Sequence, residues 1–413
     1  MSALPDSFAF APGTRRLRLD PRDPGFFRDP WPAYAALHAE GGVFCWAQQN
    51  LWCFGRHDDV NRLLRDRRLG RENRWGAPLN PAPGRAHLAA FDRVESGSIL
   101  EREPPSHTRL RSLLTRAFVS RQVEKLKPRI ERLAGTLVDG FPAGRAFDLM
   151  PSFATPIPLT IICDLLGVPL DKGDELLRWS HAMCEMYVAD RAHETELAAD
   201  RASADFAAYV RAVVADRKRA LGEDLISALI NARDAGEKLD DDELVSTCVL
   251  LLNAGHEATV HQTGNAVKTL IEQGGDPRRF FADEATAEAS VEECLRFDPP
   301  LHMFTRYVYE TFEPVPGVSV EPGQSIGLLL GMANRDPLCF EAPDEFRPGR
   351  PDQKNVTFGA GIHFCIGAPL ARLELQTGLK VLFDRCPGLA LAEPPRYRNS
   401  WHFHGLERLE VTV

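Results

Sequence analysis

The spacing of hydrophobic and polar positions along the chain changes near Arg296. Between about residues 104 and 296, apolar residues recur three and four positions apart, as in HTRLRSLLTRAF and PLTIICDLLGV, which predicts amphipathic helices. Alternating runs such as GVFCWA and LWCFG predict short strands within about residues 40–60. After Arg296, Pro and Gly divide the chain into short strands, and one last helix is expected over about residues 368–384. The pattern indicates a mainly α fold with small β-sheets.

The domain organisation follows from what the chain lacks. No Ser/Gly tract, low-complexity run or repeat of about 20 to 50 residues interrupts the 413 residues, although the length alone would also suit two or three domains. We expect one domain over residues 1–413, with a strand-rich part (about 40–60 and 300–413) around a helical part (about 104–296). The opening thirty residues, rich in Pro, Arg and Asp, are expected to wrap the surface.

Composition narrows the function classes. A net charge of −9 argues against broad nucleic-acid binding, which needs a basic surface. The N-terminus lacks an apolar run of signal-peptide length, and no segment approaches about 18 uncharged apolar residues. Nine cysteines without regular spacing suit a reducing compartment better than a disulfide framework. We therefore expect a cytoplasmic protein with no membrane span. A monomer is expected as well, although composition does not test this.

A long helix is expected over residues 240–274. Acidic residues begin it, EQGG ends it, and apolar residues near its middle occupy nearly every face, which predicts a helix that crosses the interior. Gly255 lies in mid-helix, where glycine costs about 1 kcal/mol relative to alanine. This position suggests either close approach by another group or a local opening of the helix.

Small and polar residues share the middle of this helix. Ala254 and Ala258 are four positions apart and lie on one face, and Glu257 and Thr259 place polar groups beside it. One interpretation is a helix-packing groove in which Glu257 is merely exposed or paired. The other is the wall of a ligand pocket, where the acid passes protons.

An acid and a base occur together in ASVEECLRFDPP. Glu293 and Arg296 are three positions apart on a helix that stops before two prolines. Such a pair is usually a surface salt bridge worth less than about 1 kcal/mol. A buried pair would need more partners, which Arg347 or Arg350 could supply.

A second polar face occurs in PPSHTRLR. His107 and Arg111 are four positions apart on the first turns of another expected helix. Two donors on one face suit a carboxylate or a phosphate, although a solvated face is the default expectation.

One cysteine, Cys365, lies among glycines in TFGAGIHFCIGAPLARLEL, directly before the last expected helix. A catalytic thiol would need a base, and His363 lies two positions earlier. A zinc site would need clustered ligands, but no CxxC or HxxxH pair lies near Cys365 in the sequence. A dinucleotide-binding loop would need glycine where Phe364 stands. These three interpretations are weak.

An axial thiolate to haem iron fits the stretch better, because it needs one ionised cysteine held by the backbone. Gly359 and Gly361 permit a tight turn that directs amide N–H groups at the sulfur, and Gly367 lets the next helix approach a flat macrocycle. The N-terminus of that helix favours the anionic thiolate. Phe358 is expected to pack beside the sulfur and to limit water.

At this point the chain resembles a known family. FGAGIHFCIG, EECLR, FRPGR and AGHEAT, with PPSHTRLR, ANRDP and FTR, are similar in content and order to the motifs of cytochrome P-450 enzymes of the soluble bacterial kind, from about residue 30 to the end. The resemblance implies a cytochrome P-450 fold, a triangular, mainly α prism with haem b between the long central helix and the helix after the cysteine loop.

The resemblance also implies roles for single residues. Cys365 would be the axial iron ligand. The other implied residues are the haem-binding set His107, Arg111, Arg306, Phe358, Gly359, His363 and Gly367, the oxygen-activation set Gly255, Glu257, Ala258 and Thr259, and the structural triad Glu293, Arg296 and Arg350.

The substrate pocket is placed by position in the family fold. Its expected walls are apolar, which favours a hydrophobic small molecule and leaves fatty acids, terpenoids and aromatic compounds open, although ordinary core packing is the alternative for each wall residue. A loop over about residues 91–100 would cover it. The wall residues are Leu250, Leu251, Ala254, Met303, Phe304, Trp401 and Phe403.

The implied activity is a haem-thiolate monooxygenase. It would insert one atom of dioxygen into its substrate, by hydroxylation or oxidative dealkylation, with electrons from a separate ferredoxin and its reductase. Arg109, Arg116, Lys354 and Arg372 are candidates for the docking patch, although ordinary surface is an equal alternative for each. A peroxide-driven peroxygenase is one alternative, motivated by Ala258 and disfavoured by Glu257. A haem-binding or small-molecule-binding protein without turnover is the other.

One departure from the family pattern generates a prediction. In most members Thr follows the acid of the central helix, but here Ala258 follows Glu257, and Thr259 lies about 100° further around the helix. Glu257, ordered water or a substrate hydroxyl would then relay protons to dioxygen. We predict that Ala258→Thr changes the fraction of reducing equivalents lost as peroxide, measured per NADH consumed. Identical coupling in the two proteins would contradict this relay.

Overall fold

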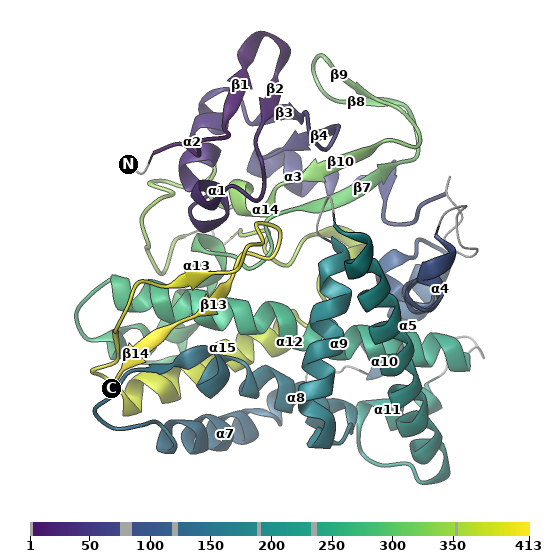
Figure 1. Cartoon of the computed structure of the whole chain (residues 1–413), viewed down its shortest axis with the longest axis vertical. Helices are drawn as coiled ribbons and strands as arrows, with labels where there is room; N and C mark the ends of the chain where they lie inside the picture. Colours follow the sequence, from purple (N-terminus) through teal and green to yellow (C-terminus); the bar gives the residue numbers. More distant parts are fainter. Residues whose placement is uncertain (1–2, 75–84, 118–122, 188–190, 233–237, 352–353) are drawn as a thin grey trace. The chain divides into compact units, whose positions relative to one another are not determined.

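The computed structural model describes residues 3–74, 85–117, 123–187, 191–232, 238–351 and 354–413 (Figure 1). It is mainly helical with short strands, which confirms the predicted fold class. The chain forms two compact units. Unit 1 comprises Met1–Leu69, Ile130–Pro156 and Ala258–Val413, and unit 2 comprises Gly70–Arg129 and Ile157–Glu257.

Unit 1 contains a seven-stranded sheet with the order β1-β2-β3-β4-β10-β7-β5. Its centre joins distant parts of the chain, since β10 pairs in parallel with β4 and antiparallel with β7, with Ile326 opposite both Trp52 and Arg306. The purple and green strands that lie side by side in Figure 1 are these segments. The strands are β1 (Ala9–Ala11), β2 (Arg16–Arg18), β3 (Val43–Trp46), β4 (Leu51–Phe54), β5 (Leu69–Gly70), β7 (Phe304–Val308) and β10 (Ser325–Leu328).

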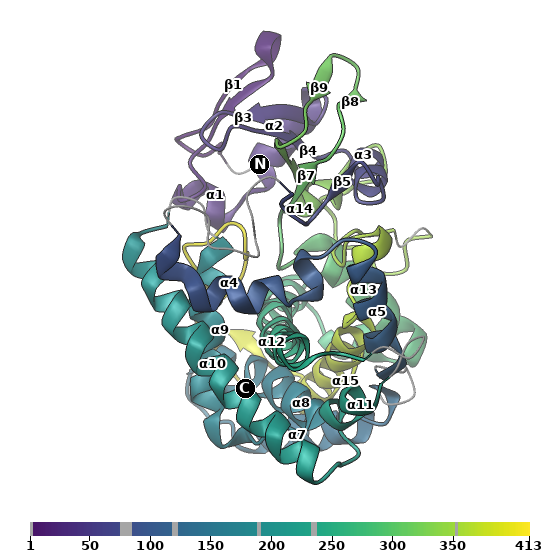
Figure 2. The same cartoon turned by 90° about the vertical axis from the view of Figure 1, so that its right-hand side faces the viewer.

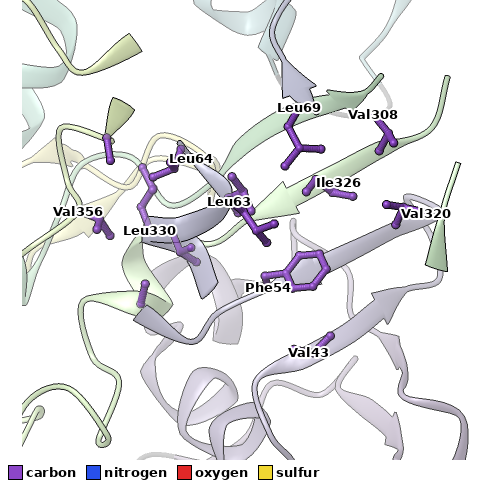
Figure 3. Packing of buried hydrophobic residues seen from close by; sticks show 14 of the residues in the cluster. Val43, Phe54, Leu63, Leu64, Leu69, Val308, Val320, Ile326, Leu330 and Val356 are labelled. Carbon is purple, nitrogen blue, oxygen red and sulfur yellow. The ribbon is translucent and has the colours of Figure 1, made fainter. Parts of the chain in front are cut away.

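A hydrophobic cluster fills one side of this sheet (Figure 3). Phe54 of β4 and Ile326 of β10 are fully buried against Leu63 of α3 (His57–Leu63). Val356 and Ala360, from the segment before Cys365, belong to the same cluster. The cysteine loop is therefore packed onto the sheet at its start.

The opening segment is more ordered than predicted. Most of its described residues are exposed or half-buried, but it also supplies β1, β2 and α1 (Pro24–Arg28), and Leu17 and Phe26 are buried. β2 pairs in parallel with β3, where Leu17 lies opposite Trp46 and is fully buried. Single apolar residues between charged ones carry no clear period, so their burial was not visible in the pattern.

The remaining elements of unit 1 are helices and small sheets. A three-stranded sheet has the order β11-β14-β6, and β12-β13 and β8-β9 form pairs. These elements are α2 (Trp31–Ala39), α7 (Lys127–Asp139), α13 (Glu284–Phe297), α14 (Leu330–Ala333), α15 (Ala368–Arg385), β6 (Phe147–Asp148), β8 (Phe312–Val315), β9 (Val318–Val320), β11 (Ala390–Leu391), β12 (Arg396–Tyr397), β13 (Leu406–Arg408) and β14 (Glu410–Thr412).

Unit 2 is built from helices. The long helix α10 packs against α9, α4 and α11 (Figure 2). Helical periods between about residues 104 and 296 predicted most of them, but α9 was not singled out. The loop expected over about residues 91–100 is wrong, because α4 and a 3-10 helix (Ile99–Glu101) occupy most of this stretch. The helices are α4 (Ala89–Ser96), α5 (Ser106–Ala117), α8 (Pro156–Leu166), α9 (Gly173–Cys184), α10 (His193–Arg219) and α11 (Leu225–Asn231).

The predicted central helix is α12 (Asp241–Glu272), which continues from unit 2 into unit 1. Its middle is buried on nearly every face, which confirms the predicted interior helix. The helix is unbroken at Gly255, and a Cβ atom there would lie 2.6 Å from Cγ1 of Ile162 on α8. Close approach of a neighbouring helix, rather than an opening of α12, explains this glycine.

Two glycines of α12 provide a matched test of this packing. Gly255→Ala places Cβ against the stiff branched chain of Ile162, and we expect overpacking to destabilise the protein by about 1–3 kcal/mol. At Gly264→Ala the nearest atom is the flexible end of Met150, Sδ at 2.8 Å, so the loss should be smaller. Midpoints of urea unfolding measure both, and equal midpoints for the two variants would contradict the role of Ile162.

Candidate active site

The conformation of the cysteine loop depends on two glycines. Gly359 and Gly361 have φ angles of +70° and +73°, which L side chains rarely adopt. A Cβ atom at Gly361 would lie 2.7 Å from the carbonyl oxygen of Leu64, so the loop approaches backbone too closely for any other residue. The amide of Cys365 donates a 3.0 Å hydrogen bond to the carbonyl of Phe358, which closes the loop.

Cys365 lies where this loop meets α15. All nine cysteines belong to the described part of the chain, and Cys365 is the exposed one, whereas the others are buried or half-buried. Gly367 precedes the first residue of α15, and a Cβ atom there would stand 3.8 Å from the sulfur. The thiol is therefore presented to the surface of unit 1 beside the N-terminus of a helix, where the backbone favours an anion.

The predicted triad is formed within unit 1. Glu293 accepts hydrogen bonds from Arg296 at 2.8 Å, through both Nε and Nη2, and from Nε of Arg350 at 3.0 Å. The backbone amide of Arg347 adds a fourth donor at 2.7 Å. Because Glu293 is 3% and Arg296 2% exposed, the pair is buried, and it has the additional partners that burial requires.

The triad is connected to the cysteine loop through Asn334. Arg296 donates to the carbonyl of Asn334 at 2.9 Å, and the Asn334 amide oxygen accepts from the backbone of Val356 at 2.8 Å. Asn334 Nδ2 donates to Thr357 Oγ1 at 2.8 Å, and this hydroxyl donates to the carbonyl of Leu295 at 2.7 Å. These bonds fix the chain eight and nine residues before Cys365. The motif ANRDP contained Asn334, but its role was not predicted.

A second connection comes from α15. Arg372 pairs with Glu292 of α13, with Nη2 and Oε2 3.1 Å apart, and its guanidinium lies 4.7 Å from the ring centre of Phe358. Asn355 also donates to Glu292, at 3.0 Å. Arg372 thus packs on the ring of Phe358 at the start of the loop. Of the other proposed docking residues, Arg109 pairs with Glu243.

The haem-binding residues predicted in unit 1 lie on neighbouring segments. Arg306 is on β7 and is 4% exposed, and His363 is half-buried at the end of a short 3-10 helix, Gly361–His363. Phe304, also on β7, contacts the loop, because a Cβ atom at Gly359 would lie 3.1 Å from its ring. The strand β7 and the cysteine loop therefore lie side by side.

The residues predicted in unit 2 share one helix. His107 and Arg111 occupy successive turns of α5, with His107 2% exposed and Arg111 half-buried. The face of α5 that these two residues share is therefore at least partly buried, rather than the solvated face that was the default expectation.

Glu257 of α12 is buried, with 4% of its surface exposed, and its carboxylate lies beside two imidazoles. Its Oε2 lies 3.2 Å from Nε2 of His181 on α9 and 3.7 Å from Nε2 of His256. The side chain of His181 is 49% exposed, so this imidazole connects a buried carboxylate with the surface of unit 2. His181 was missed, because α9 carries no motif and the pairing exists only in three dimensions.

The predicted pocket residues are found in different environments. Leu251 is buried, Leu250 and Phe403 are half-buried, and Ala254 is exposed. Met303 and Trp401 belong instead to a buried hydrophobic cluster. The ring of Trp401 stacks on that of Phe26, with 5.4 Å between ring centres, and its Nε1 donates a 2.7 Å hydrogen bond to the Tyr34 hydroxyl. For these two residues the structure favours core packing, the alternative to a pocket wall.

The comparison with known families decides the identity of the fold. The family described as Cytochrome P450 matches residues 74–273 and 286–388. The chain belongs to the cytochrome P450 family. PikC, a cytochrome P450 monooxygenase of Streptomyces venezuelae, is 35% identical over 90% of this chain and 87% of its own length. The Vitamin D(3) 25-hydroxylase of Pseudonocardia autotrophica is 36% identical over 94% of each chain.

Solved structures agree with this assignment. P450BioI, in complex with hexadec-9Z-enoic acid ligated acyl carrier protein, is similar with a TM-score of 0.86 and 31% identity, covering 94% of this chain and 98% of that chain. The protein is therefore a cytochrome P450 monooxygenase, an oxidoreductase of a family that binds haem through a cysteine thiolate. Within the described residues, no helix has the length and apolar character needed to cross a membrane.

The residues of unit 1 fit such a group. Cys365 offers a sulfur ligand at the surface of the unit, and its amide is held by the hydrogen bond to the carbonyl of Phe358. Gly367 lies beside the sulfur, and Arg306 supplies a buried cation on the adjacent strand.

The triad generates a stability prediction for this P450. Glu293→Gln removes the countercharge of two buried guanidinium groups, and we expect a loss of about 3–5 kcal/mol in the free energy of unfolding. Arg347→Ala is the matched control. Its side chain makes surface ion pairs worth less than about 1 kcal/mol, and its bond to Glu293 comes from the backbone and remains. Urea unfolding followed by circular dichroism compares them, and similar small losses would contradict the structural role of the triad.

Proposed function

We propose that this P450 inserts one atom of dioxygen into a hydrophobic small molecule, with Cys365 as the axial ligand of haem b. The observation that carries the proposal is the placement of Cys365, the exposed cysteine of the chain, at the junction of a glycine-constrained loop and the N-terminus of α15. A thiolate so placed is held by the backbone and can serve a metal as a single protein ligand.

The bound haem would supply the activation of dioxygen. The chain's own residues would bind and orient the haem. His107, Arg111, Arg306 and His363 are proposed as the donors for the two haem carboxylates, because cationic side chains and imidazoles bind carboxylates well. Phe358, fixed by Arg372, would limit water beside the sulfur. Glu293, Arg296 and Arg350 would act structurally, since they contact each other and the backbone.

Proton supply is assigned to Glu257. Its carboxylate contacts His181, whose imidazole reaches the surface of unit 2, so a proton taken from solvent by His181 can be passed to Glu257 Oε2. Ala258 provides no hydroxyl beside it, and Thr259 is buried with 7% exposure. Glu257 and His181 would therefore replace the usual threonine in this role, with Gly255 allowing the close packing of α12 on α8.

The substrate class is proposed from apolar residues and from relatives. Leu250, Leu251, Ala254, Phe304 and Phe403 remain candidates for the pocket walls. Relatives named for vitamin D(3) hydroxylation, or solved with a hexadec-9Z-enoic acid ligated acyl carrier protein, act on or bind large hydrophobic groups. We infer a substrate of that kind, electrons from a separate ferredoxin and reductase, and a monomer acting in the cytoplasm.

A spectroscopic prediction tests the ligand. In Cys365→Ser the thiolate is lost, so we expect the reduced carbon monoxide complex to lose the red-shifted Soret band of a thiolate-ligated haem and oxygen insertion to fall below detection. Cys339→Ser, at a half-buried cysteine, is the matched control and should retain both. An unchanged band in Cys365→Ser would overturn the assignment. A normal band in the parent protein, but no turnover with any ferredoxin, would favour a non-catalytic haem protein.

A further inference from the structure

Two histidines and a glutamate, to which no role is assigned above, meet in unit 2. His87 lies in a 3-10 helix (Ala86–Leu88) directly before α4, and His193 and Glu196 lie on the first turn of α10. Together they form the one group of three or more metal-type ligands found among the described residues. His193 and Glu196 are three positions apart, so they share a face of α10, and His87 faces them from the adjacent segment.

The donor atoms of this His87–His193–Glu196 cluster already converge. Nε2 of His87 lies 2.7 Å and Nδ1 of His193 3.8 Å from the same atom, Oε2 of Glu196. The two imidazole rings are 4.7 Å apart between centres. All three donor atoms lie within 4.8 Å of one another. A tetrahedral zinc ion with bonds of about 2.0–2.2 Å places its ligand atoms roughly 3.3–3.6 Å apart, so small side-chain rotations, chiefly of the exposed His193, would complete the set.

The surroundings hold the cluster in place. Oε1 of Glu196 lies 3.0 Å from Nη2 of Arg191, which leaves Oε2 for the two histidines. One turn further along α10, Asp200 Oδ1 accepts hydrogen bonds from the backbone amides of Ala90 at 2.7 Å and Phe91 at 3.0 Å. α10 thus carries both the carboxylate of the cluster and the cap of α4. Arg191 binds the other oxygen of Glu196 and so orients this carboxylate, and such outer partners are typical of metal sites.

We propose that His87, His193 and Glu196 form a binding site for a divalent transition-metal ion, with zinc as the best-suited ion and water completing the coordination. Two imidazoles and one carboxylate are donors that zinc accepts in tetrahedral sites. The bound ion would join the segment that begins α4 to the first turn of α10. It would therefore stabilise their packing, and the inference is independent of the haem assignment.

The test is a zinc chloride titration of the purified, chelator-treated haem protein by calorimetry. We expect one zinc ion to bind per chain, and His193→Asn to weaken binding by at least the roughly 10- to 100-fold that loss of an outer partner costs at metal sites. This variant retains the His87–Glu196 contact, so the fold is not at risk. Glu194→Gln, which removes an exposed acid of the same turn, is the matched control and should bind like the parent.

A second readout reports on the location of the ion. Because zinc binds the folded protein, it should raise the melting temperature of the parent and of Glu194→Gln, and not that of His193→Asn. Absence of stoichiometric binding in the parent would overturn the proposal. So would equal affinity in His193→Asn, since zinc would then be held elsewhere, for example by a cysteine thiolate.

Discussion

The buried carboxylate of Glu293 is the constraint on which much of unit 1 depends. A charge that is 3% exposed persists only when every side of it is hydrogen-bonded, because burial removes the hydration that would otherwise stabilise it. Arg296 comes from the same helix, but the remaining donors come from Arg347 and Arg350, more than fifty residues later. Satisfying one carboxylate therefore fixes the path of a distant, irregular segment that has no secondary structure of its own.

The same network explains how a single thiol can be placed without other ligands. The far side of Arg296 donates to the carbonyls of Asn334, Pro343 and Glu345, and Asn334 in turn holds the segment that begins the cysteine loop. Two glycines with positive φ then complete a turn that packs against the backbone of unit 1. The position of Cys365 is thus set by backbone hydrogen bonds and steric exclusion, which suits a ligand that must stay fixed while chemistry occurs beside it.

In unit 2, polar side chains are brought together where long helices pack against one another. On α12, the turn that contains Glu257 lies against His181 of α9, and on α10 successive turns carry Glu196 and Asp200 toward the segment around α4. Each buried or half-buried acid is met by a donor from another helix. Such pairs stabilise helix packing, and an imidazole in them adds the capacity to hold a proton or a metal ion.

The sequence by itself determined the fold class, the extent of α12 to within two residues at each end, the position of α15 and the identity of the family, because helical periods and short motifs are local in the chain. It also indicated that Glu293 would need a partner near Arg350. Only the tertiary structure decided that Asn334 holds the cysteine loop, that His181 meets Glu257, that Trp401 belongs to an aromatic core and that the N-terminal segment adds strands to the sheet. These features depend on contacts between residues far apart in the chain, and no local pattern of hydrophobic and polar positions records which distant surfaces will meet.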